Sequence, residues 1–93
     1  MSHPVTELVI YKVKNPQTAT LARRQMQAHF NAHPGFLAWQ PLSSTSDACL
    51  FADIVTWTDE ASARSAGEKV MTDEACAPLM AEIAEIISMG HYA

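Results

Sequence analysis

Two segments of this chain, residues 5–14 and 48–57, alternate like β-strands but carry apolar side chains on both faces. An antiparallel sheet with one face in water would alternate apolar with polar residues. Both segments therefore need cover on both sides. The sheet that contains them requires a layer of helices on one face and a second apolar surface on the other.

The remaining segments supply those helices and two more strands. The predicted order is strand 5–14, helix 17–32, strand 36–44, strand 48–57, helix 59–71, short helix 73–82 and strand 85–92, with 81–87 as an alternative continuation of the helix. Pro41 predicts a bulge or an edge position for the second strand. The order is that of a ferredoxin-like split βαβ fold, a four-stranded antiparallel sheet with helices on one face.

The sequence Thr-Asp-Glu-Ala occurs at 58–61 and again at 72–75. A hydroxyl or carboxylate followed by acidic residues is typical of a helix start, where acids face the positive end of the helix dipole. We therefore expect a helix to begin at each copy.

Length and charge narrow the class of protein. Ninety-three residues fit a single domain, 1–93. The net charge of -4 and the lack of a basic cluster beyond Arg23 and Arg24 disfavour nucleic acid as a partner. No segment resembles a signal peptide or a membrane span, so we expect no membrane partner and a cytoplasmic location. Cys49 and Cys76 are expected to be free thiols.

The second apolar face of the sheet points to self-association. The simplest cover is the same face of another copy, in a two-fold contact. The alternative is a moderately apolar face in solvent. We expect a homodimer.

Asp53 and Trp57 share one face of the third strand. A carboxylate in an apolar strand is costly unless it is paired, protonated or near water. Asp53 is therefore either a structural hydrogen-bond anchor or part of a binding pocket that has Trp57 as an aromatic wall. Tyr11, on the first strand, is a candidate donor to a ligand, with core packing as its alternative.

His91, on the last strand, is the candidate base. An imidazole can take a phenolic proton near neutrality. If the two strands are neighbours, His91 would also pair with Asp53. The alternative is a histidine of the core or of the dimer interface.

His29 and His33 have the spacing of a helical metal pair, but no third ligand follows at a recognisable spacing. We expect no metal, and we place both histidines at the mouth of a pocket or at the end of the first helix. No glycine-rich phosphate loop is present, so no nucleotide cofactor is expected.

The chain resembles the dimeric α+β barrel group and, within it, the antibiotic-biosynthesis-monooxygenase-like family. The resemblance covers nearly the whole chain. It is carried by Phe30 with His33-Pro34-Gly35-Phe36, by Asp53-Ile54-Val55-Thr56-Trp57 running into Asp59-Glu60-Ala61, and by Met89-Gly90-His91-Tyr92.

The resemblance implies a pocket between sheet and helices in each subunit, with His91 and Asp53 as catalytic candidates and Trp57, Tyr11, His29, His33 and Phe30 as binding candidates. It implies a monooxygenase that uses no cofactor and oxidises a small phenol or quinol, whose deprotonated form gives an electron to oxygen. The alternatives are a non-enzymatic ligand-binding or stress-associated dimer, and an isomerase. The haem-degrading branch uses a histidine on the second helix; residues 59–71 contain none, which argues against that activity.

Overall fold

The computed structural model describes residues 3–93. Its elements are β1 (Val5–Val13), α1 (Pro16–Phe30), β2 (Phe36–Ser43), β3 (Leu50–Trp57), α2 (Glu60–Val70), α3 (Ala77–Glu82) and β4 (Ile83–Tyr92). The strands form one antiparallel sheet in the order β2-β3-β1-β4. The predicted ferredoxin-like arrangement is confirmed.

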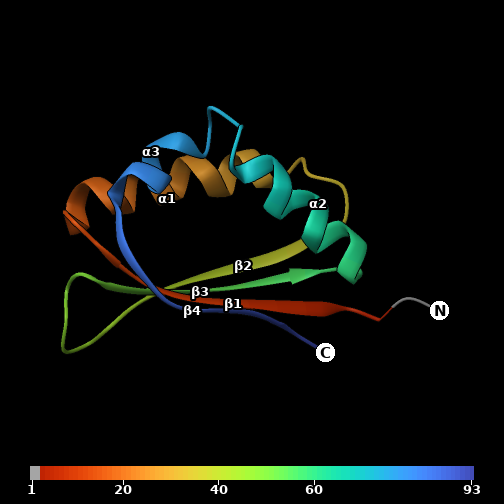
Figure 1. Cartoon of the computed structure of the whole chain (residues 1–93), viewed down its shortest axis with the longest axis horizontal. Coiled ribbons are helices and arrows are strands. Elements are labelled where there is room, and N and C mark those ends of the chain that lie inside the picture. Colours follow the sequence, from red (N-terminus) through yellow and green to blue (C-terminus); the bar gives the residue numbers. More distant parts are fainter. Residues whose placement is uncertain (1–2) are drawn as a thin grey trace.

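The three helices lie on one face of the sheet, and the other face is bare (Figure 1). β1 and β3 occupy the centre of the sheet, while β2 and β4 form its edges. The two segments that are apolar on both faces are therefore the central strands. Among residues 3–93, no helix combines the length and hydropathy needed to cross a membrane.

Side-chain caps explain where α1 and α2 begin. The Asn15 side chain accepts a hydrogen bond from the Thr18 N–H, and Pro16 stands at the first helical position, where its missing N–H costs nothing. The Asp59 carboxylate accepts from the Ser62 N–H at 2.8 Å, as expected for the first Thr-Asp-Glu-Ala copy.

The second copy does not start a helix, so that prediction was wrong. Asp73 caps only a turn, accepting from the Ala75 N–H, and α3 begins later with no side-chain cap. The same four residues thus serve two local structures, because a carboxylate that accepts from the N–H two residues ahead closes a turn as readily as a cap.

The start of β4 and the position of the irregularity in β2 also differ from the prediction. β4 begins at Ile83, so residues 83–87 extend the sheet rather than the helix. β2 is an edge strand, as its proline predicted, but its irregularity lies between Phe36 and Ala38 rather than at Pro41. At the start of β2, Gly35 has φ +82°, and a side chain there would meet Ser62 and Thr58.

The core lies between the helices and the sheet. Its largest fully buried side chains are Trp57, Tyr11, Phe51 and Cys76. Cys76 and the partly buried Cys49 are free thiols. Asp53 is on the same face as this core and is only 4% exposed. Its side chain therefore points toward the helices, which is where a pocket was expected.

Candidate functional site

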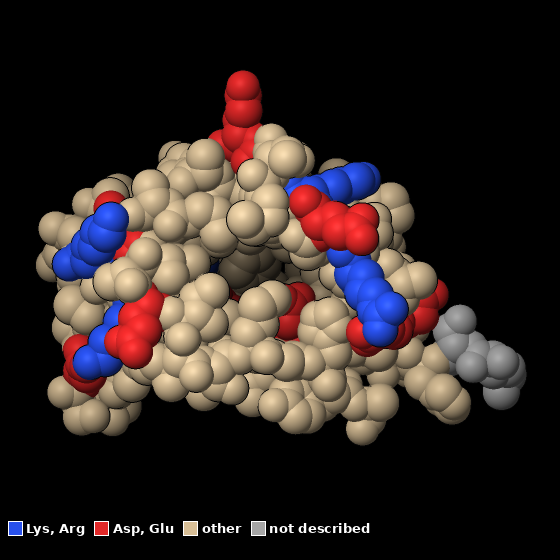
Figure 2. Space-filling view, viewed as in Figure 1, with Lys and Arg blue, Asp and Glu red and all other residues tan. Residues whose placement is uncertain are grey.

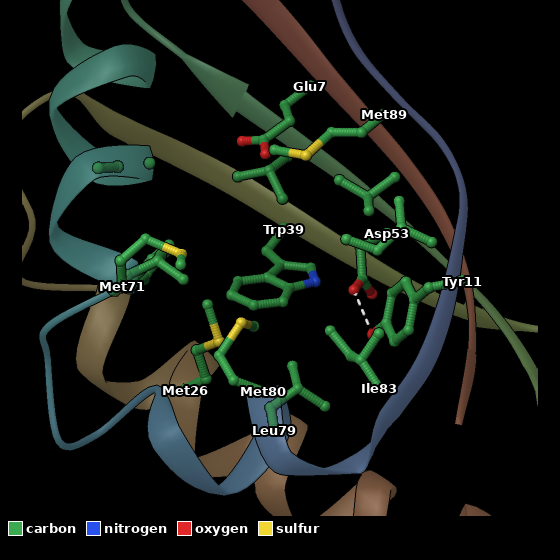
Figure 3. A pocket seen from close by; sticks show the side chains of 17 residues that line it. Glu7, Tyr11, Met26, Trp39, Asp53, Met71, Leu79, Met80, Ile83 and Met89 are labelled. Carbon is green, nitrogen blue, oxygen red and sulfur yellow. Dashed lines mark hydrogen bonds between the residues drawn. The ribbon is translucent and has the colours of Figure 1, made fainter. Parts of the chain in front are cut away.

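A cavity of about 180 Å³ lies between the sheet and the helices. Its mouth is the hollow between the helical layer and β4 in the space-filling view, where the rim is mostly uncharged and red acidic atoms show at its lower edge (Figure 2). The side chains that line it are shown in Figure 3, and they are mostly apolar. The polar groups among them come from Glu7, Tyr11, Trp39 and Asp53.

Methionine is the most frequent residue type in the cavity wall. Four of the five in the chain line the cavity: Met26, Met71, Met80 and Met89. Met71 and Met89, near the mouth, are exposed, and so is Ile86. Methionine side chains are unbranched and polarizable, and they adapt to the shape of what they contact. The wall can therefore adjust to a flat apolar ligand without movement of the backbone.

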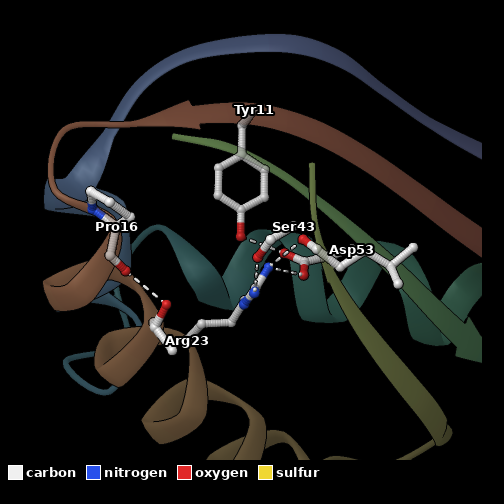
Figure 4. Close-up of polar contacts among 7 residues, drawn as sticks. Tyr11, Pro16, Arg23, Ser43 and Asp53 are labelled. Carbon is white, nitrogen blue, oxygen red and sulfur yellow. Dashed lines mark hydrogen bonds and ion pairs between the residues drawn. The ribbon is translucent and has the colours of Figure 1, made fainter. Parts of the chain in front are cut away.

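Asp53 is held in a buried network (Figure 4). Its Oδ2 accepts from the Tyr11 hydroxyl at 2.6 Å, and its Oδ1 accepts from Arg23 Nη1 at 3.2 Å. The same Arg23 nitrogen donates to the Leu42 carbonyl oxygen, and the guanidinium lies over the Phe51 ring. The Asp53 carboxylate is thus paired on both oxygens, and its negative charge is balanced by a buried cation.

The Tyr11 hydroxyl is a weaker acid than an ordinary tyrosine. Burial raises the pKa of its hydroxyl well above the ordinary value, and the neighbouring Asp53 carboxylate raises the pKa further. The phenol therefore stays protonated and donates its hydrogen bond to Asp53. Together Tyr11 and Asp53 form a fixed polar patch on the sheet wall of the cavity.

Glu7 is a second carboxylate on the same wall. Its Oε1 accepts from the Trp57 indole N–H at 3.2 Å, and this bond holds the side chain in place. Burial raises the pKa of Glu7, while the Trp57 bond and the nearby His91 oppose the shift. A partly desolvated carboxylate beside an apolar cavity is a typical general base, because its pKa is moved toward neutrality.

His91 does not meet Asp53. β1 lies between β3 and β4, so the two residues are on strands that are not neighbours. His91 instead pairs opposite Glu7 in the sheet, and its Nδ1 lies 2.9 Å from Glu60 Oε1 at the start of α2. It does not belong to the residues that line the cavity.

The other predicted residues separate into two groups. Phe30 lines the cavity, whereas Trp57 is fully buried behind Glu7 and is not part of the wall. His29 pairs with Asp73 at 2.6 Å, and His33 Nδ1 lies 3.0 Å from the Pro34 carbonyl oxygen. Both histidines border a separate open hollow outside the cavity. Within residues 3–93, no three His, Cys, Asp or Glu side chains gather as a metal site would require.

Three polar residues of the site were not predicted from the sequence: Arg23, Glu7 and Trp39. Arg23 falls on the inward stripe of α1, three positions before Met26 and four after Ala19. Glu7 alternates in phase with Val9 and Tyr11, so it had to face inward as well. The inward orientation of Arg23 and Glu7 could therefore have been predicted from the sequence. Trp39 could not be placed, because the irregularity between Phe36 and Ala38 decides which face it occupies.

Comparison with known proteins supports the fold. No protein-family model matches this sequence, and neither does any curated protein. Solved structures do match. SnoaB, a cofactor-independent oxygenase from Streptomyces nogalater, is 20% identical with a TM-score of 0.85, covering 99% of this chain and 93% of its own.

Two further solved structures are similar to this chain over nearly its whole length. A candidate antibiotic biosynthesis monooxygenase from Nitrosomonas europaea is 18% identical with a TM-score of 0.83, over 100% of this chain and 91% of its own. A Bacteroides thetaiotaomicron protein of unknown function is 12% identical with a TM-score of 0.79, over 99% and 98%. The chain has the fold of these proteins, and the resemblance predicted from the sequence is confirmed at that level. Function has to be argued from the site.

Proposed function

We propose that this chain is a monooxygenase that needs no cofactor and oxidises a small hydroxylated aromatic with molecular oxygen. The observation that supports this most is the cavity itself: a largely apolar, methionine-lined space with the partly desolvated carboxylate of Glu7 on its wall, apart from the Asp53 carboxylate that Arg23 and Tyr11 already pair. Glu7 is the proposed base, in place of His91. The fold that the chain shares with a cofactor-independent oxygenase agrees with the proposal.

The proposed reaction begins when Glu7 removes the proton from the aromatic hydroxyl. The resulting oxyanion gives one electron to dioxygen, and the aromatic radical and superoxide combine to form a carbon–oxygen bond on the ring. Loss of the ring hydrogen with cleavage of the oxygen–oxygen bond then yields a quinone and water. One oxygen atom enters the product and the other leaves as water, so dioxygen is the sole oxidant.

The other residues have supporting roles in this proposal. Asp53 and Tyr11 form the fixed polar patch against which the ring is oriented, and Phe30 adds an aromatic surface. Trp57 and His91 are positioning residues: the first donates to Glu7, and the second lies opposite Glu7 in the sheet. The dry walls protect the radical pair from water.

Oxygen uptake tests the proposal. Purified protein is mixed with a panel of phenols, naphthols and hydroquinones, and oxygen consumption is followed together with quinone absorbance. We expect one oxygen molecule consumed for each quinone formed from at least one member of the panel, and no uptake with the methyl ethers, which have no proton to lose. Panel members that bind tightly without any oxygen uptake would instead identify a binding protein or an isomerase.

We further propose that the protein works as a homodimer through the bare face of its sheet. In the pairing register Leu8 lies opposite Ile54, and Ile10 opposite Ala52, on the face turned away from the helices. Lys12 lies on this face too, but at the end of its strand. An apolar surface of this kind is stabilised when a second copy covers it, in a contact where each subunit uses the same residues.

Light scattering coupled to size exclusion measures this directly. We expect a mass twice the 10.2 kDa of the chain, and a single-chain mass for Ile54→Arg, because a charged side chain on this apolar face would have to leave water when a second copy covers it. Gln25→Arg, on the exposed surface of α1, adds the same charge and is expected to leave the dimer intact. A wild-type protein that elutes as a monomer at micromolar concentration would contradict the proposal.

A further inference from the structure

The Trp39 side chain carries a hydrogen-bond donor that no residue described in the structure satisfies. Trp39 lines the cavity, and its Nε1 is buried with no hydrogen-bond partner among residues 3–93. A buried N–H without an acceptor costs about 1–3 kcal/mol, and such groups are rare in folded proteins. An unpaired donor in the wall of a cavity indicates that the acceptor comes with the occupant.

The position of the ring defines where that acceptor would sit. Trp39 packs against Phe30, with ring centroids 5.5 Å apart, so one part of the indole is fixed by the core. The nitrogen is on the side of the ring that faces Asp53 in Figure 3. Asp53 already accepts from Tyr11 and Arg23. Met26 and Met80 line the same cavity as Trp39, and their flexible side chains can adjust to an occupant.

The size of the cavity limits the ligand. An engineered apolar cavity of about 150 Å³ holds one benzene molecule. The 180 Å³ found here suits one ring, or two fused rings once the methionines adjust. Three or four fused rings would not fit inside, although a substituent can extend past Ile86 and Met89 at the mouth.

We propose that the cavity selects one- or two-ring aromatics that carry a carbonyl group, and that the Trp39 N–H donates to the carbonyl oxygen. This inference rests on the proposed function and names its substrate class: a hydroxyaryl ketone or a related compound with both groups. The hydroxyl faces Glu7 and the carbonyl faces Trp39, which lie on different strands of the same wall. Two polar anchors on a flat apolar ligand fix which ring carbon meets oxygen.

A binding experiment with ligands that have no hydroxyl group, and so cannot react, tests this inference separately from the oxygenase proposal. Indan-1-one and indane have the same fused rings and differ in one carbonyl. We expect wild-type protein to bind the ketone about tenfold more tightly, the typical effect of one hydrogen bond to a donor that is otherwise unpaired. Trp39→Phe should remove this preference and leave the affinity for indane nearly unchanged. In the nitrogen–proton spectrum of wild-type protein, the Trp39 indole signal should move downfield with indan-1-one alone.

The outcomes separate the two proposals. Equal affinity for the two ligands with an unmoved indole signal, or a ketone preference that survives in Trp39→Phe, would overturn the role of Trp39 and leave the oxygenase proposal standing. Failure of both ligands to bind would contradict both, since the cavity would then not accept aromatics at all. The spectrum uses wild-type protein, so the test does not depend on the variant folding.

Discussion

Replacing Arg23 with methionine is expected to lower the free energy of unfolding by about 3–5 kcal/mol, the cost of leaving a buried charge without its partner. The Arg23 and Asp53 side chains are 7% and 6% exposed, so water can replace little of the lost interaction. Methionine keeps the contact with Phe51 but cannot donate to Asp53 or to the Leu42 carbonyl oxygen. Chemical denaturation monitored by tryptophan fluorescence measures the loss.

Two companion variants identify the cause. Arg24→Met, at the exposed neighbouring position, should change stability by less than about 0.5 kcal/mol. Asp53→Asn in the Arg23→Met background removes the stranded charge while keeping an acceptor for Tyr11, and should recover a large part of the loss. If Arg23→Met cost under about 1 kcal/mol, Asp53 would have to be hydrated through the cavity, and the network would not be the closed ion pair described above.

Replacing Glu7 with glutamine is expected to reduce kcat/KM for the hydroxyaromatic substrate by about 100-fold or more, the usual contribution of a general base. Glutamine keeps the size of the side chain and an oxygen that can accept from Trp57, so the cavity should keep its shape. In wild-type protein the rate should rise with pH as Glu7 loses its proton. That rise should be absent from Glu7→Gln.

As pH rises, the contribution of Glu7 to the free energy of unfolding should fall while the reaction rate rises. Because burial raises the pKa of Glu7 in the folded protein, the protonated form favours folding. Its contribution is fully present below the pKa of the unfolded chain and is lost as pH rises through the pKa of the folded state. Glu7→Gln should therefore match wild type in acid and be the more stable of the two at neutral pH.

Two further variants, on α2 and on β4, serve as controls for Glu7. Glu68→Gln, on the exposed surface of α2, should leave both rate and stability nearly unchanged. His91→Ala should move the rise in rate to higher pH, because the electrostatic interaction with His91 lowers the pKa of Glu7 in the wild-type protein. A merely structural His91 would change the amount of folded protein but not the pH of that rise. Full activity in Glu7→Gln would remove Glu7 from the reaction.

Most of the fold was predictable because most of its elements are encoded locally. The apolar alternation of the central strands, the Asn15-Pro16 start of α1 and the proline in an edge strand are patterns within a few residues. The start of β4 was not predictable in this way. Residues 83–87 are apolar enough for either a helix or a strand, and pairing with β1 decides between them.

The site was only partly predictable, for a related reason. Asp53 was correctly singled out as an enclosed carboxylate, but its partner Arg23 is thirty positions earlier, and only the packed fold brings them together. The strand order separates His91 from Asp53 and places it beside Glu7. Periodicity tells which residues face inward, whereas strand order tells which of them meet.

The central claim is that this cavity supports oxygen transfer from dioxygen to an aromatic ring. Turnover of the best panel substrate under ¹⁸O₂, followed by mass spectrometry of the product, tests it most directly. The account predicts one ¹⁸O atom in each quinone formed by wild-type protein, with formation suppressed about 100-fold in Glu7→Gln. A quinone that carries no ¹⁸O, or labelled quinone formed equally fast without the protein, would contradict it.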